Sequence, residues 1–182
     1  MTGGTAEPLY ERDYYAWTRQ QAAELRSLAE RQVNIPLDLA NLAEEVEDLG
    51  KGERDAVRSR VRRIIERLLK LEFSRSAGPR AAWRESVIDA RNTLDDKMTA
   101  SLRLDIEAEL ARLFQQARDK AAAGLERFDE FDAAGALPEE CPYTLDDIRR
   151  ERWYPASRHG HSDRRNGGSS GRRRTRRGQT SG

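Results

Sequence analysis

The sequence predicts an all-α protein: a compact bundle of four main helices and a short C-terminal helix, followed by a disordered basic tail. Charged residues make up 36% of the 182 residues and hydrophobic residues 37%, so one core requires apolar residues gathered into narrow stripes. Apolar residues recur at steps of three or four, as in helices. No stretch long enough for a strand shows apolar and polar residues in strict alternation. The chain length fits one domain and a tail.

The first helix is predicted over residues 13–33. Asp13 is a good N-cap, and Pro36 disfavours the helical conformation in the residue before it. Trp17, and Trp83 in a later helix, are expected to be core anchors. The predicted buried face of the first helix consists of Tyr14, Trp17, Gln21, Leu25, Leu28 and Gln32.

The second helix is predicted over 38–72, with Asp38 as its N-cap. Its stripe consists of Leu39, Leu42, Val46, Leu49, Val57, Val61, Ile64, Leu68 and Leu71. Gly50 and Gly52 interrupt good helix formers. The eleven-residue step from Val46 to Val57 is almost a whole number of turns, which favours one long helix. A helix end at Gly50 is the alternative, because glycine commonly follows a helix C-terminus.

Three further helices are expected. The third covers 80–98 and the fourth 102–123, and the spacing from Thr144 to Asp147 is that of a capping box opening a short helix near 144–151. The predicted organisation is therefore a flexible N-terminus at 1–7, a bundle domain at 8–156 and a tail at 157–182.

Charge is distributed unevenly along the chain. Eight arginines and one acidic residue give residues 157–182 a charge of +7, so residues 1–156 carry −6 of the total of +1. This tail lacks leucine, isoleucine, valine and aromatic residues, and it is therefore predicted to be disordered. Its candidate polyanion-binding residues, which would attract phosphates of any sequence, are Arg172, Arg173, Arg174, Arg176 and Arg177.

Charged side chains also follow the edges of the second and third helical stripes. They are expected to pair across an antiparallel seam and to set its register. The functional alternative is a cleft in which Arg84 and Arg91 hold an anion or Glu44 and Glu45 bind a metal, although successive glutamates on a helix point about 100° apart. The candidate cluster is Glu44, Glu45, Glu53, Arg60, Arg67, Arg84 and Arg91.

The sequence contains no recognisable motif for a metal site, a cofactor, catalysis or a membrane helix. Cys141 is the single cysteine, and there is no Cys/His ligand cluster, so no metal, cofactor or catalytic residue is predicted and a reducing compartment is expected. No apolar run approaches the roughly 18 residues of a membrane helix. We therefore expect a cytoplasmic protein that does not enter membranes.

Several short motifs occur together in one order. They are Tyr10 to Trp17 (YERDYYAW), Leu37 to Gly50 (LDLANLAEEVEDLG), Leu68-Leu69-Lys70, Trp83-Arg84, Arg91 and Pro138 to Leu145 (PEECPYTL). From about residue 8 to residue 155 the chain resembles the bacterial domain of unknown function 29 family. This resemblance implies a compact all-helical bundle and no established activity. The family pattern tends to carry histidine where this chain has Arg67.

Three functions are compatible with these observations. The leading hypothesis is a non-enzymatic helical protein-interaction module that engages another protein or a second copy of itself. The alternative is a nucleic-acid-associated adaptor in which the basic tail makes weak nonspecific contacts. The second alternative is an enzyme or ligand-binding protein that uses the Glu/Arg cluster.

Overall fold

The structure is a computed structural model that describes residues 7–32 and 34–161. Helices occupy most of these residues: α1 (Leu9–Arg12), α2 (Tyr14–Glu30), α3 (Leu39–Phe73), α4 (Arg80–Lys97), α5 (Ala100–Glu126), α6 (Phe131–Gly135) and α7 (Leu145–Arg149). Over these ranges there is no strand, so the all-α prediction is confirmed. The candidate arginines of the tail, Arg172 to Arg177, lie outside the described residues.

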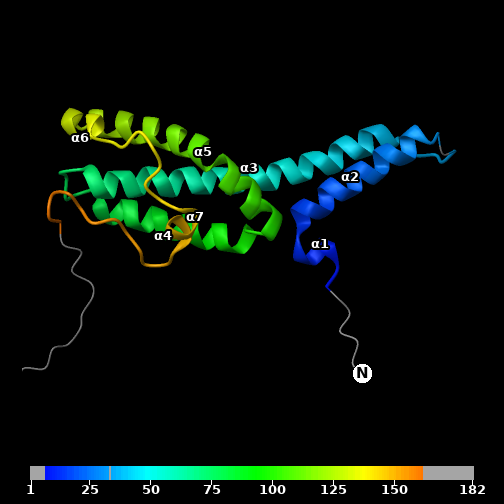
Figure 1. Ribbon diagram of the computed structural model, residues 1–182, viewed down its shortest axis with the longest axis horizontal. Helices are drawn as coiled ribbons and strands as arrows, with labels where there is room; N and C mark the ends of the chain where they lie inside the picture. Colours follow the sequence, from blue (N-terminus) through cyan, green and yellow to red (C-terminus); the bar gives the residue numbers. More distant parts are fainter. Residues whose placement is uncertain (1–6, 33, 162–182) are drawn as a thin grey trace, which may run out of the picture.

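The 35-residue helix α3 runs through the whole molecule and organises it (Figure 1). Helix α2 packs against the N-terminal part of α3, whereas α4 and α5 pack against its C-terminal part. We call α2 together with residues 39–53 of α3 the arm, and the remainder of the described chain from residue 54 onward the body. In the body α4 is antiparallel to α3, and α5 is parallel to it (Figure 1).

The core of the body forms where α4 and α5 meet the second half of the α3 stripe. Val57, Val61, Ile64 and Leu68 of α3 have no exposed area, and they join one cluster with side chains from α4, α5 and α7. Ile148 of α7 is also fully buried. The short segment around α7 therefore closes the bundle.

Helix α3 continues through Gly50 and Gly52 without interruption, as the eleven-residue spacing favoured. The reason for glycine at position 50 is close packing. A Cβ atom on Gly50 would overlap the Oγ1 atom of the buried Thr18 and lie 3.2 Å from its Cβ. Gly50 thus permits α2 to approach the backbone of α3.

The predicted buried face of the first helix is wrong. Helix α2 buries Tyr15, Thr18 and Ala22, whereas Tyr14 and Trp17 of the predicted face are only half-buried. Trp83 is 9% exposed and is a core residue as expected. Thr18 and Ala22, which α2 presents to α3, are small and allow the two helices to pack closely. The larger side chains of Tyr14 and Trp17 lie beside this contact, where they are only partly covered.

Polar contacts attach the beginning of α2 to the beginning of α5. The carboxylate of Asp13 accepts hydrogen bonds from the backbone N–H of Ala16 at 2.9 Å, and from the N–H and hydroxyl of Ser101 at 3.0 and 2.7 Å. The Tyr15 hydroxyl donates to Asp105 at 2.7 Å. Asp13 therefore caps α2, as predicted, and also links the arm to the body.

We expect the variant Asp13→Asn to lower the free energy of unfolding at neutral pH by about 1–2 kcal/mol. Burial raises the pKa of Asp13, but the hydrogen bonds from Ala16 and Ser101 outweigh it and hold the pKa below its ordinary value. The carboxylate thus stabilises the fold above the unfolded pKa of about 3.9, and this stabilisation is lost as pH falls through the lower folded pKa. Urea denaturation across this pH range should show the difference between the two proteins shrinking in acid.

The matched control for this prediction is Asp96→Asn on the exposed surface of α4. It should match the parent protein within about 0.5 kcal/mol at every pH. A difference for Asp13→Asn that stayed constant down to pH 3 would show that ionisation of Asp13 does not contribute to stability.

Candidate functional site

The charged residues singled out by their spacing lie in separate parts of the structure. Glu44 and Glu45 are exposed on α3 in the arm. Within the described ranges, no group of three or more His, Cys, Asp or Glu side chains is placed to hold a metal ion. Glu53 forms an ion pair with Lys97 of α4 at 2.7 Å, which is a seam contact of the predicted kind.

The arginines of the candidate cluster have different surroundings. Arg60 is half-buried on α3, and Arg67 donates to its neighbour Glu66 at 3.1 Å. The guanidinium carbons of Arg84 and Arg91 lie 4.7 and 5.3 Å from the ring centre of Tyr154. Both guanidinium groups lie over the Tyr154 ring at distances that suit cation–π contacts.

Arg91 does not pair with a carboxylate of α3, so this part of the seam prediction is wrong. Arg91 is 4% exposed, and it donates to the backbone carbonyls of Ile148 at 2.8 Å and Asp147 at 3.4 Å. Burial lowers the pKa of the Arg91 guanidinium. Its role in this structure is to hold the chain at the end of α7 against α4.

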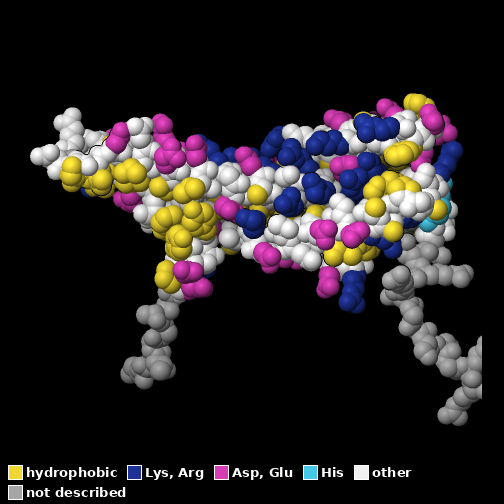
Figure 2. Space-filling view, turned by 180° about the vertical axis from the view of Figure 1, so that it is seen from behind, with side chains coloured by type: hydrophobic (Ala, Val, Ile, Leu, Met, Phe, Trp, Pro, Cys, Tyr) yellow, Lys and Arg dark blue, Asp and Glu magenta, His cyan; other side chains and the backbone are white. Residues whose placement is uncertain are grey.

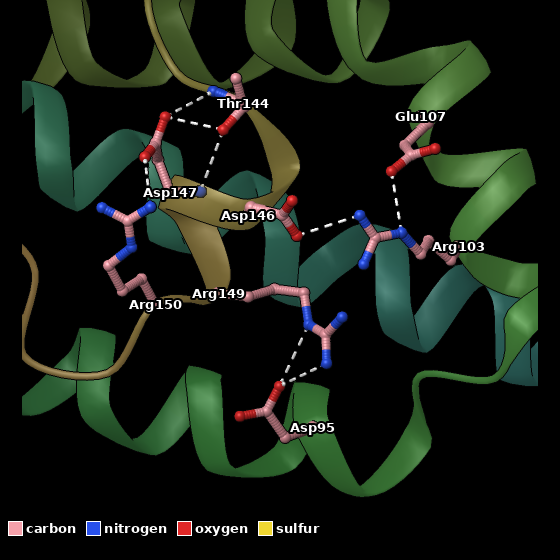
Figure 3. Close-up of polar contacts among 8 residues, drawn as sticks. All are labelled: Asp95, Arg103, Glu107, Thr144, Asp146, Asp147, Arg149 and Arg150. Atoms are coloured by element: carbon pink, nitrogen blue, oxygen red, sulfur yellow. Dashed lines mark hydrogen bonds and ion pairs between the residues drawn. The ribbon is translucent and has the colours of Figure 1, made fainter.

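Helix α7 is fastened to both neighbouring helices by ion pairs (Figure 3). Arg149 donates to Asp95 of α4 at 3.1 Å, and Arg103 of α5 donates to Asp146 at 3.0 Å. The predicted capping box is present: Thr144 Oγ1 accepts from the Asp147 N–H at 3.1 Å, and the Asp147 carboxylate accepts from the Thr144 N–H at 3.2 Å. These contacts hold α7 between α4 and α5, where Ile148 is buried.

Replacing Arg91 with alanine should lower the free energy of unfolding by about 1–3 kcal/mol, because two backbone carbonyls lose a charged donor in a buried place. The control is Arg149→Ala. Its ion pair with Asp95 is more exposed, and we expect it to cost at most about 1 kcal/mol. Urea denaturation of both variants tests this order, and equal costs would contradict it.

A second feature is a hydrophobic surface on the arm, which we call the apolar arm face. Leu49 is 55% exposed, Tyr10 50% and Leu42 39%. The face consists of Tyr10, Tyr14, Trp17, Leu25, Leu28, Leu42, Val46 and Leu49.

Aromatic rings form the end of this face nearest the body. The ring centroid of Tyr10 lies 4.8 Å from that of Trp17 and 5.5 Å from that of Tyr14, with edge-to-face geometry. Tyr14 and Trp17 are stacked at 5.6 Å. Helix α1 thus extends the hydrophobic surface of α2 by adding Tyr10.

The apolar residues of both arm helices lie on one side of the arm. Arg26 of α2 and Glu47 of α3 form an ion pair across the two helices, which marks the polar side. At 3.6 residues per turn, Leu25 and Leu28 of α2 lie away from this ion pair, and so do Leu42, Val46 and Leu49 of α3. Figure 2 shows the resulting band of hydrophobic side chains along the arm and around its junction with the body.

Similarity to known proteins identifies the family of this chain. A family model described as Domain of unknown function DUF29 matches residues 9–154. The chain belongs to the DUF29 family. No curated protein matches the chain. Within the described residues of this DUF29 chain, no helix is long and apolar enough to cross a membrane.

A solved structure shares the DUF29 chain's fold. It is an alpha-helical protein of unknown function from Rhodospirillum rubrum, similar with a TM-score of 0.71 and 30% sequence identity. The similarity covers 80% of this chain and 92% of the other. The expected helical bundle is therefore also found in a crystal structure.

Proposed function

We propose that this DUF29 chain is a non-enzymatic helical protein-interaction module that binds its partner through the apolar arm face. The observation that carries the proposal is the uncovered hydrophobic band along α2 and the N-terminal part of α3 (Figure 2). Contiguous exposed apolar surfaces on proteins commonly mark interaction sites. Tyr and Trp, which form one end of the band, are also enriched at such sites.

The shape of the arm favours a helical partner. Two antiparallel helices with one uncovered apolar side correspond to half of a four-helix bundle. A partner helix laid along the apolar arm face, beside Leu42 and Leu49, would cover apolar side chains at spacings of three and four residues. The same face ends at the aromatic rings of Tyr10 and Trp17, which provide large contact area with few rotatable bonds.

Charge distinguishes between kinds of partner. The arm, residues 14–30 and 39–53, contains seven acidic and three basic residues, so it has a net charge of −4. Two copies of this arm would repel each other, whereas an amphipathic helix with basic residues beside its apolar stripe would be attracted. We therefore infer that the partner is a basic amphipathic helix of another protein.

Site-specific photo-crosslinking tests the proposal. A photoreactive residue at position 49 should give an adduct in cells, and mass spectrometry should place the adduct on a basic amphipathic helix. The same residue at Ile88 on α4, which is 50% exposed, serves as a control of matched exposure and should give none. The variant Leu49→Glu should reduce partner retention at least about ten-fold while changing stability by less than about 0.5 kcal/mol.

Two results would count against the proposal. Equal adducts at positions 49 and 88 would show that the apolar arm face has no preference for a partner. Sedimentation of the purified protein as a dimer that Leu49→Glu dissociates would assign the face to a second copy of the chain instead.

The two alternative functions have less support from the described residues. Contact of the tail with nucleic acid depends on Arg172 to Arg177, which lie outside the described residues, and it stays a prediction. A single cleft formed by the Glu/Arg cluster is not supported, because Glu44 and Glu45 lie on the arm and Arg84 and Arg91 lie beneath Tyr154 in the body.

A further inference from the structure

A hollow with a volume of about 460 Å³ lies between α3, α4 and α5, in the body and away from the apolar arm face. The lining residues that matter for binding are Arg67 and Lys70 of α3, Trp83 of α4, Lys120 of α5, and Arg127 and Phe128 just after α5. Figure 2 shows that Lys and Arg side chains gather over the body. We call this hollow the basic pocket.

Positive charge in the basic pocket exceeds negative charge. Its lining contains four cationic side chains and the single carboxylate of Glu66. One oxygen of Glu66 accepts from both Lys70, at 2.7 Å, and Arg67, at 3.1 Å. Among the described residues, Lys120 and Arg127 have no ion-pair partner, and the buried Nε of Arg67 has no hydrogen-bond acceptor.

In a neighbouring hollow of about 300 Å³ between α3 and α5, arginines do have ion-pair partners. There Arg58 is paired with Asp55 at 2.9 Å and also with Glu109. Glu109 pairs with Arg112 as well. In this hollow Arg58 and Arg112 are thus paired with carboxylates, and Arg62 donates to the amide oxygen of Gln116 at 3.0 Å. In the basic pocket, by contrast, Lys120 and Arg127 have no carboxylate partner among the described residues.

Gly124 shapes the floor of the basic pocket. A Cβ atom at this position would overlap the Nζ of Lys70 and lie 2.7 Å from its Cε. The glycine therefore lets the largely buried Lys70 side chain reach the backbone of α5, with its ammonium group at the pocket. Phe128, which is 64% exposed, and Trp83 add apolar surface to the lining.

We propose that the basic pocket binds the phosphate monoester of a small organic molecule with a flat apolar part. Arg67, Lys120 and Arg127 would hold the phosphate oxygens, because charge-assisted hydrogen bonds from such side chains suit a dianion. Phe128 would contact the apolar part. The volume lies in the range typical of small-molecule sites, about 300–1,000 Å³. This site is independent of the partner proposed for the apolar arm face.

Titration calorimetry with phenyl phosphate, inorganic phosphate and phenol tests separately whether the pocket binds the phosphate and whether it binds the flat apolar group. Phenyl phosphate should bind more tightly than either fragment. Its affinity should rise as pH increases through about 6, where a phosphate monoester loses its second proton. Lys120→Gln and Arg127→Gln, both at exposed positions, should each raise the Kd about ten-fold.

The matched control is Arg112→Gln, which removes the same charge from the same helix at the neighbouring hollow. It should change the Kd less than about two-fold if binding is local. Gly124→Ala should weaken binding, because a Cβ there displaces the Lys70 ammonium and so lowers the positive charge of the pocket and disturbs the Glu66 contact that Lys70 shares with Arg67. Circular dichroism would confirm that this variant still folds.

Several outcomes would overturn the proposal. The absence of saturable heat with phenyl phosphate at millimolar concentration would contradict the proposal, and so would binding of phenyl phosphate no tighter than that of inorganic phosphate. An equal loss of affinity in Arg112→Gln would indicate a diffuse effect of surface charge. An RNA oligonucleotide that binds in preference to phenyl phosphate, with equal sensitivity to Arg112→Gln and Lys120→Gln, would assign the basic surface to a polyanion.

Discussion

Replacing Leu68 with alanine is expected to lower the free energy of unfolding by about 2–5 kcal/mol. Leu68 lies in the part of α3 where both α4 and α5 pack, and its side chain has no exposed area. The substitution removes buried apolar surface and leaves a cavity that helices packed on both sides cannot easily fill. Urea denaturation followed by circular dichroism measures the change.

The control for Leu68 is the same substitution at an exposed leucine. Leu104 of α5 is 68% exposed, so Leu104→Ala should change stability by no more than about 0.5 kcal/mol. Equal midpoints for Leu68→Ala and the parent protein would contradict the placement of Leu68 in the core.

The four main helices could be predicted because each contains several turns of periodic sequence. The predicted range 38–72 agrees closely with α3 at Leu39–Phe73. The reason is that nine apolar residues at helical spacing fall on one side of a single continuous helix. The four residues of α1 and the five of α6 are too short to show a period. Their positions depend on contacts with α2 and α5, which a sequence pattern does not contain.

The face that α2 buries could not be read from hydrophobicity. The stripe through Tyr14 and Trp17 is more apolar than the face with Thr18 and Ala22, and hydrophobicity alone selects the former. Helix pairs can also pack through small side chains that let backbones approach. The small residues opposite each other, Thr18 on α2 and Gly50 on α3, were the available signal for this packing.

The candidate sites depend on tertiary contacts to different degrees. The apolar arm face uses the predicted stripes, but its exposure follows only from the position of α2. The basic pocket joins Arg67, Trp83 and Lys120, which are far apart in sequence, and no motif links them. Arg91 was identified as a candidate from its spacing, yet its partners are backbone carbonyls, which residue identities do not reveal.

Gly50→Ala and Gly52→Ala are expected to change stability in opposite directions, although the two glycines lie two residues apart in α3. At Gly50 a Cβ would overlap Oγ1 of Thr18, and overpacking of this kind costs about 1–3 kcal/mol. At Gly52 nothing lies within 4 Å of a Cβ. Alanine there should raise stability by about 0.5–1 kcal/mol through its greater helix propensity.

A double-mutant cycle with Thr18→Ala shows whether the overlap causes the loss at Gly50. Removing Oγ1 of Thr18 takes away the nearest atom and leaves the Cβ contact at 3.2 Å. The double variant should therefore be more stable than the sum of the single changes predicts, by about 0.5–3 kcal/mol. Thr18→Ala combined with Gly52→Ala should be additive, because Gly52 has no such neighbour. A gain in stability for both single glycine variants would mean that α2 and α3 do not approach closely at Gly50, and the exposure of the apolar arm face would then lose its structural basis.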